Sequence, residues 1–172
     1  MHFLLTNAVA ALIPLLIGFA WYNPKVFGKA WMASAGMTED SMKGANMALV
    51  FGLTYLFSFF LATELNFITI HQFGLFSMFQ DPAGKAALAD PNSELGKTVH
   101  GLLTTYQNNF RTYKHGALHG FIAGVTFALP IVGVNALFER KGFKYIAINA
   151  GFWIVCCVLM GAIVCHWQVR AF

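Results

Sequence analysis

The chain has 172 residues, of which 58% are hydrophobic and only 10% are charged. Soluble domains usually carry about 25% charged residues, and so short a chain cannot bury this much apolar surface in one core. The composition therefore excludes an ordinary water-soluble protein, and the net charge of +4 is too modest to indicate nucleic-acid binding. We expect a single all-α domain in lipid, a four-helix bundle with one long polar loop between its second and third helices.

The first two apolar runs predict two membrane-spanning helices. A crossing needs about 20 consecutive apolar residues. The first run covers about residues 2–22 and contains Pro14, which a membrane helix tolerates as a kink. The second run is interrupted only by Glu64 and is too long for one crossing. We predict a span over about residues 45–67 that continues as an emergent or interfacial stretch, with a re-entrant segment as the alternative.

Two further spans are predicted over about residues 115–138 and 145–167. In the third span, Gly116, Gly120 and Gly124 recur at four-residue spacing. Such a stripe of small residues lets a neighbouring helix approach closely. The alternative is that glycine is simply common in membrane helices.

Three other residues of these two spans affect the helices themselves. Pro130 is predicted to kink the third span. Asn135 and Asn149 are predicted to pack helices together through interhelical hydrogen bonds worth about 1 kcal/mol each.

Two polar segments connect the spans. Residues 81–112 read as a structured extramembrane loop with a short helix from Ser93 to Phe110, capped by Ser93. Residues 24–44 mix aromatic and basic side chains and are predicted to lie flat in the membrane interface. The predicted membrane-interface residues are Trp21, Tyr22, Lys25, Phe27, Lys29, Trp31, Arg140, Lys141, Lys144 and Trp167.

The charges predict an orientation. We call the side that holds the 24–44 loop and the 139–144 turn the basic face; it carries six Lys and Arg residues against five on the opposite side. Three of the six lie in the short 139–144 turn, and short loops weigh most in the positive-inside rule. We therefore expect the basic face to be cytoplasmic and both termini to be non-cytoplasmic.

All six histidines fall at or near the side opposite the basic face, which we call the histidine face. They are His2, His71, His100, His115, His119 and His166. His115 and His119 are four residues apart and share one side of the third span, a spacing that suits two imidazoles on one metal. His71 and Glu64 approach the same level from the second span, so the predicted metal ligands are His115, His119, His71 and Glu64.

Each of these predictions has an alternative. Interfacial imidazoles also bond backbone carbonyls and lipid headgroups, as amphipathic side chains do. Glu64, a carboxylate inside a span, is a functional-site hypothesis by default, but it lies near the histidine face, where a structural hydrogen bond is the alternative.

No catalytic motif is present: the chain has no CxxC pair, no Gly-rich phosphate loop and no Ser-His-Asp pattern. We therefore expect a non-enzymatic accessory or structural subunit that binds other membrane proteins or lipids, or forms a homo-oligomer. No cofactor is firmly implied. The first alternative is a metal-, haem- or proton-handling protein that uses the histidine face, and the second is an oligomeric small-solute transporter.

Residues 18–32, with the sequence GFAWYNPKVFGKAWM, resemble the opening motif of the domain-of-unknown-function 1761 family. His119-Gly120-Phe121 through Pro130, and residues 149–153 (NAGFW), are similar in style, so the resemblance covers most of the chain. It implies a small polytopic membrane protein of bacteria and some eukaryotes, here in a bacterial inner membrane. The 81–112 segment is longer than expected for the family, and the family brings no activity from which catalytic residues can be carried over.

Overall fold

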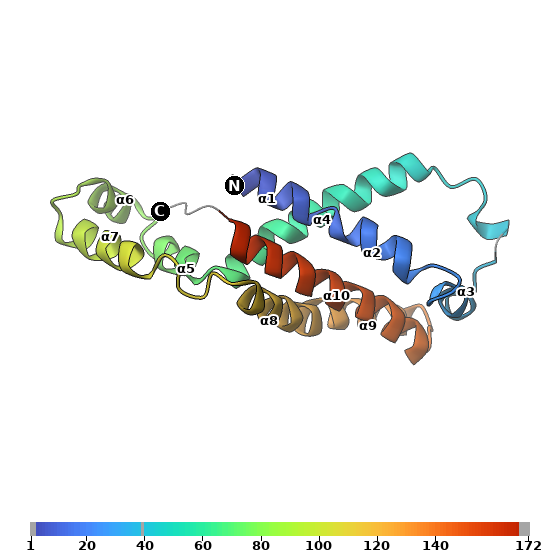
Figure 1. The fold of residues 1–172 in the computed structure, drawn as a ribbon. Helices are drawn as coiled ribbons and strands as arrows, with labels where there is room; N and C mark the ends of the chain where they lie inside the picture. Colours follow the sequence, from blue (N-terminus) through green and yellow to red (C-terminus); the bar gives the residue numbers. More distant parts are fainter. Residues whose placement is uncertain (1–2, 39, 169–172) are drawn as a thin grey trace.

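The computed structural model describes residues 3–38 and 40–168, and these form helices without any strand (Figure 1). Four helices in this part of the chain are long and apolar enough to cross a membrane: Phe3–Trp21, Met47–Thr69, Tyr113–Phe138 and Phe143–Trp167. The predicted all-α four-helix bundle is therefore confirmed.

The first span is broken near its middle. Two residues, Ala11 and Leu12, separate α1 (Phe3–Ala10) from α2 (Ile13–Trp21), and Pro14 lies in the first turn of α2. Backbone N–H groups in the first turn of a helix have no partner within the helix. A proline there removes one such N–H group, so it takes no hydrogen bond away from α2. The short helix α3 (Gly28–Ala35) and a 3-10 turn, η1 (Asp40–Met42), then lead to the second span.

The second span, α4 (Met47–Thr69), begins at Asn46, whose side chain accepts a hydrogen bond from the Leu49 amide. It ends at Ile70, which adopts an extended conformation and separates α4 from α5 (His71–Ser77). Figure 1 shows α5 beyond the end of the bundle, so this stretch emerges from the bundle and does not re-enter it.

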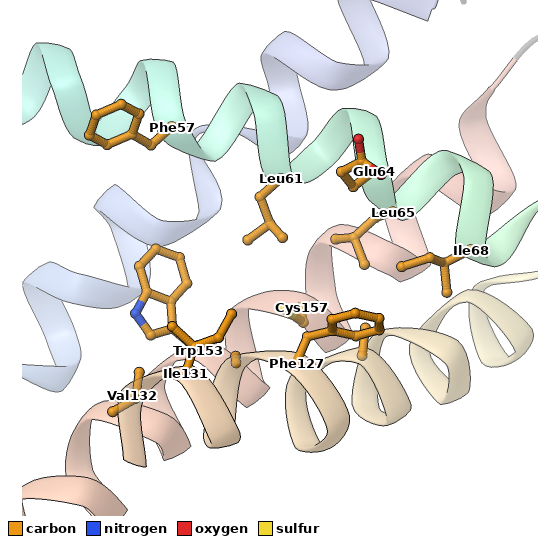
Figure 2. Close-up of a pocket in the computed structure, with 12 residues that line it drawn as sticks. Phe57, Leu61, Glu64, Leu65, Ile68, Phe127, Ile131, Val132, Trp153 and Cys157 are labelled. Carbon is orange, nitrogen blue, oxygen red and sulfur yellow. The ribbon is translucent and has the colours of Figure 1, made fainter. Parts of the chain in front are cut away.

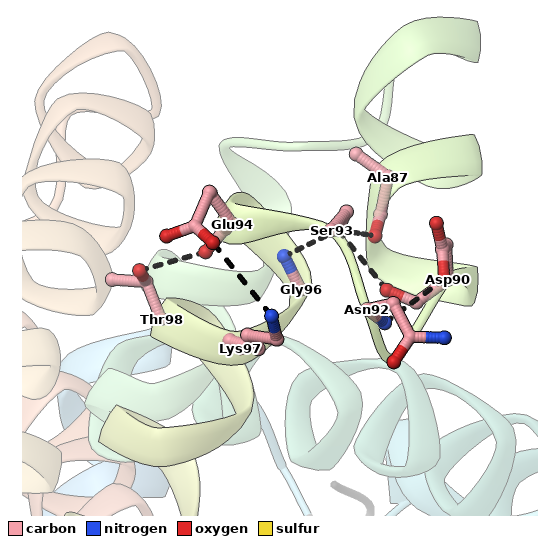
Figure 3. A network of polar contacts seen from close by, with 8 residues as sticks. All are labelled: Ala87, Asp90, Asn92, Ser93, Glu94, Gly96, Lys97 and Thr98. Carbon is pink, nitrogen blue, oxygen red and sulfur yellow. Dashed lines mark hydrogen bonds and ion pairs between the residues drawn. The ribbon is translucent and has the colours of Figure 1, made fainter.

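The 81–112 loop folds into a helical hairpin of α6 (Pro82–Ala89) and α7 (Glu94–Tyr106). The predicted cap is confirmed: the Ser93 hydroxyl accepts a hydrogen bond of 2.8 Å from the Gly96 amide and donates to the carbonyls of Ala87 and Asp90 (Figure 3). The helix ends at Tyr106, earlier than predicted, because the chain turns there toward the third span.

The third span is not one regular helix. α8 (Tyr113–Ala123) continues into a π-helical turn, η2 (Gly124–Ala128), and then into α9 (Leu129–Phe138). Pro130 lies two residues after the π turn, and its ring and missing N–H oppose regular α-helical hydrogen bonding in the turn before it. The irregularity predicted at Pro130 is therefore present as a π-helical turn.

The fourth span, α10 (Phe143–Trp167), is the central helix of the bundle. α8 packs on it through the glycine stripe, where a Cβ atom added at Gly120 would lie 2.1 Å from the Cys157 carbonyl oxygen. One added at Gly116 would lie 2.2 Å from the Gly161 oxygen, and Gly161 meets Gly116 in the same way. The two backbones are therefore in direct contact, which only glycine permits.

A pair of buried amides joins the first two spans. The Asn66 amide group donates to the Asn7 side-chain oxygen at 2.7 Å and to the Ala62 carbonyl at 2.7 Å. Asn7 in turn donates to the Thr63 hydroxyl at 3.1 Å. In an apolar surrounding such bonds fix the register of two helices.

We predict that Gly120→Ala destabilises the protein by about 1–3 kcal/mol, because overpacked contacts force the backbones apart. The matched control is Gly52→Ala on α4, where an added methyl group meets nothing within 4 Å. Thermal unfolding in detergent, followed by tryptophan fluorescence, measures both variants. Equal melting temperatures for the two variants would show that the close helix contact carries no stability.

Candidate metal centre

Three imidazoles meet at the histidine face of the bundle. They belong to His71 at the start of α5 and to His115 and His119 on α8, and one ring nitrogen of each lies within 4.8 Å of the others. His71 is exposed, whereas His115 and His119 are half-buried. The group is therefore reachable from solvent on one side and is backed by helices on the other.

Local structure explains why these rings converge. His115 and His119 are one helical turn apart, and their ring centroids are 4.4 Å apart. The extended residue Ile70 ends α4, and His71 lies directly beyond it, with its ring 4.9 Å from His115 and 5.1 Å from His119. The Nε2 atoms of His71 and His115 are 2.9 Å apart, so one ring donates a hydrogen bond to the other.

Phe110 covers the same group, a role that the sequence did not reveal. Its ring lies 5.1 Å from His115 and 5.8 Å from His71, measured between centroids. Its φ of 61° is in the left-handed region, which is strained for an aromatic residue. The Phe110 carbonyl accepts hydrogen bonds from the Thr112 amide at 2.9 Å and the Cys165 thiol at 3.3 Å, which hold the strained residue in place.

The loop before α8 is tied to the end of α10. The Arg111 guanidinium donates to the Cys165 carbonyl at 2.8 Å and also to the Gln168 carbonyl, so it caps the last turn of α10. One residue later, the Thr112 side chain accepts a hydrogen bond from the His115 amide and begins α8. These bonds fix the start of α8 and with it the position of His115.

The donor atoms of the group suit a transition-metal ion. Neutral imidazoles bind zinc, copper, nickel and iron at about 2.0–2.1 Å, which places tetrahedral ligand nitrogens roughly 3.3 Å apart. The present separations, 2.9 Å between His71 and His115 and within 4.8 Å for the whole group, bracket that spacing. Three protein ligands leave a fourth position for water or another ligand, as in open metal sites.

Glu64, the fourth predicted ligand, and the other histidines lie outside this group. Glu64 is not part of the group, because it precedes His71 by seven residues, which is about 10 Å along a helix, and the chain breaks between them. His166 stacks on Tyr113 at 4.0 Å and bonds the Arg111 carbonyl, and His100 bonds the Leu88 carbonyl. His2 lies outside the described residues.

A second polar cluster lies at the basic face and centres on Asn149. Its side-chain oxygen accepts hydrogen bonds from the Tyr22 hydroxyl at 3.0 Å and the Trp31 indole at 3.2 Å, and its amide donates to the Tyr145 carbonyl. Burial raises the pKa of Tyr22, so its hydroxyl keeps its proton and donates. Trp21 donates to the Ile148 carbonyl at 3.1 Å.

These bonds dock the end of the first span, and through Trp31 the 24–44 loop, on α10. Trp21, Tyr22 and Trp31 point to α10, and the Lys141 ammonium reaches the Ala35 carbonyl at the end of α3. The other predicted interface residues are exposed: Lys25, Phe27, Lys29, Arg140, Lys144 and, at the histidine face, Trp167. Asn135, predicted as a packing residue, is exposed on α9 and lies outside the helix interfaces of this chain.

Comparison with known proteins gives the family. The model of the family described as "Protein of unknown function (DUF1761)" matches residues 5–165, so the chain belongs to this family. No curated protein and no solved structure matches the chain. The function must therefore be argued from the site itself.

We predict that Asn149→Ala loosens the loop at the basic face, because it removes the acceptor for both Tyr22 and Trp31. The loss should be about 1–2 kcal/mol, the worth of two such hydrogen bonds. Hydrogen–deuterium exchange of the α3 amides should rise in this variant. Asn135→Ala is the control, since that side chain is exposed; unchanged exchange in Asn149→Ala would show that α3 is held by other contacts.

Proposed function

We propose that this member of the DUF1761 family is an integral membrane protein that binds one transition-metal ion through His71, His115 and His119. The observation that carries the proposal is the convergence of three ring nitrogens, within 4.8 Å of one another, from two separate elements. Two histidines four residues apart are common on helices, but a third one delivered by a different helix is a specific arrangement.

The convergence of a third ring supports a cation more than a pairwise hydrogen bond does. The Nε2 atoms of His71 and His115, 2.9 Å apart, satisfy one another through a single hydrogen bond when both rings are neutral. The His119 ring lies beside both, with its centroid 5.1 Å from that of His71 and 4.4 Å from that of His115. A bound cation satisfies the lone pairs of all three rings at once. Nitrogen donors favour zinc, copper, nickel or iron over magnesium and calcium, which prefer oxygen.

The arrangement of the three rings does not suit haem, which the sequence analysis gave as an alternative. The three rings lie with centroids 4.4–5.1 Å apart, tilted or edge to face. A porphyrin needs a flat slot beside its axial imidazole, and rings packed this closely on one another leave no such slot between them. A single small ion fits between the same nitrogens.

Metal binding therefore ranks above the accessory-subunit function that the sequence favoured. Exposed apolar helix faces are what lipid covers in any membrane protein, so they do not by themselves indicate a protein partner. Converging imidazoles have a chemical consequence of their own. The proposal assigns a binding function and no catalytic step.

We also propose that the bundle lies in a bacterial inner membrane with the 139–144 turn in the cytoplasm. Three basic residues in this short turn support the orientation by the positive-inside rule. The histidine face, with the metal centre and the α6–α7 hairpin, is then on the non-cytoplasmic side.

We predict that purified wild-type protein binds one zinc ion per chain, measured by isothermal titration calorimetry and by elemental analysis after dialysis. His71→Ala, His115→Ala and His119→Ala should each weaken binding by more than about 100-fold, because even residues that only orient a ligand contribute 10–100-fold. His166→Ala is the matched control, an exposed histidine of the same face outside the group. Zinc binding that survives all three substitutions would refute the proposal.

Orientation is tested by thiol labelling, since the three native cysteines are buried. We predict that Thr98→Cys on α7 reacts with a membrane-impermeant maleimide in intact spheroplasts. Arg140→Cys in the 139–144 turn should react only after the membrane is permeabilised. The reverse pattern would place the histidine face in the cytoplasm.

A further inference from the structure

A lateral cavity of about 510 Å³ lies between α4, α10 and the η2–α9 part of the third span (Figure 2). Its wall is apolar, with Phe57 and Leu61 on one side and Phe127 and Ile131 on the other. Glu64 is the only charged residue in the wall. All of its lining residues belong to the candidate membrane spans.

The cavity wall and the histidine group share α8 and also meet at the junction of α4 and α5. Ala123 of the wall follows His119 by four residues of α8, which is about one helical turn, roughly 5 Å. Ile68 of the wall precedes His71 by three residues, with the extended residue Ile70 between them. One end of the cavity therefore lies next to the histidine group, and the other extends toward Phe57, deeper in the bundle.

The π turn belongs to this cavity. Phe127 and Ala128, both in η2, line it, so the irregular part of the third span forms one wall. Single π turns inside helices are frequent at functional sites. Here the turn ends two residues before Pro130, which opposes a regular helix at this point.

Resting on the metal site proposed above, we infer that the cavity holds the chain of a long-chain carboxylic acid whose carboxylate completes the metal coordination. A volume of about 510 Å³ is within the 300–1,000 Å³ range of single small-ligand sites, so it suits one acyl chain better than a two-chain lipid. An apolar cavity beside a cation with one open ligand position matches an amphiphile with one anionic end.

Charge supports a carboxylate head. Three neutral imidazoles leave the full double charge of a divalent ion at the boundary of a low-dielectric region, where an uncompensated charge is costly. A bound carboxylate supplies a negative charge directly at the ion. A neutral head would leave the double charge without any compensation from the ligand.

The test uses the full chain in nanodiscs, loaded with zinc, and a diazirine-bearing fatty acid of 16–18 carbons, the usual length of membrane acyl chains. A phosphatidylcholine that carries the same diazirine chain is the comparison probe. Zinc binding is measured by calorimetry on the same samples. We expect saturable labelling of cavity residues by the fatty acid, displaced by free oleate and about tenfold weaker without zinc, as loss of one good ligand bond predicts.

The diagnostic variant is Leu61→Trp, which fills the cavity without touching a metal ligand. It should bind zinc as the wild type does but label about tenfold less, because a filled interior leaves no void for the chain. Leu118→Trp, an exposed position of α8 outside the cavity, is the matched control. If Leu61→Trp does not fold, Ile131→Trp replaces it, since that residue lines the cavity and is itself exposed.

Two results would overturn the inference while the metal site stands. One is equal labelling by the phosphatidylcholine probe without displacement by oleate, which would show an ordinary lipid-filled groove. The other is fatty-acid labelling that is the same with and without zinc and in His119→Ala. Absence of zinc binding by calorimetry would overturn the metal site and this inference together, so the two failures are distinguishable.

Discussion

The backbone contact between α8 and α10 is the constraint on which the rest of the structure depends. Gly116 and Gly120 press against α10 so closely that no side chain fits between the helices. His115 and His119 each precede one of these glycines, and one residue is a rotation of about 100° around a helix. Fixing the glycine side against α10 therefore turns both imidazoles away from α10, to where His71 meets them. The glycines therefore orient the two imidazoles, although they supply no ligand atom themselves.

α10 also connects the two ends of the molecule. At the basic face its Asn149 accepts hydrogen bonds from Tyr22 and Trp31, and at the histidine face its last carbonyls are capped by Arg111. Arg111 belongs to the loop that precedes α8, so the helix that holds the 24–44 loop also fixes the position of His115 and His119. Polar side chains at both ends can be rigid in this way because each is satisfied by a partner on another element.

Much of this fold follows from sequence, because the bilayer limits what a chain can do. Apolar length identifies the spans, four-residue glycine spacing identifies a close helix contact, and Ser93 identifies a cap. The site is harder to predict from the sequence than the fold. Counting residues along a helix gives the depth of a side chain but not its direction. The depth of Glu64 therefore predicts a place beside the histidines, whereas the structure places it among the residues that line the cavity. The helix break at Ile70 and the left-handed backbone conformation of Phe110 depend on tertiary contacts, and no local residue pattern predicts them.

The position of the site at the boundary of the bundle limits what it can bind. His71 is exposed at the end of the spans, so a metal ion reaches the group from water without crossing lipid. The cavity one turn away is apolar and lies within the spans, so a water-soluble ligand gains nothing there. A purely apolar ligand fills the cavity but leaves the fourth metal position to water. A molecule that is apolar along most of its length and anionic at one end suits both regions at once, with its anionic end toward the histidine group that lies beyond Ile68 and Ala123.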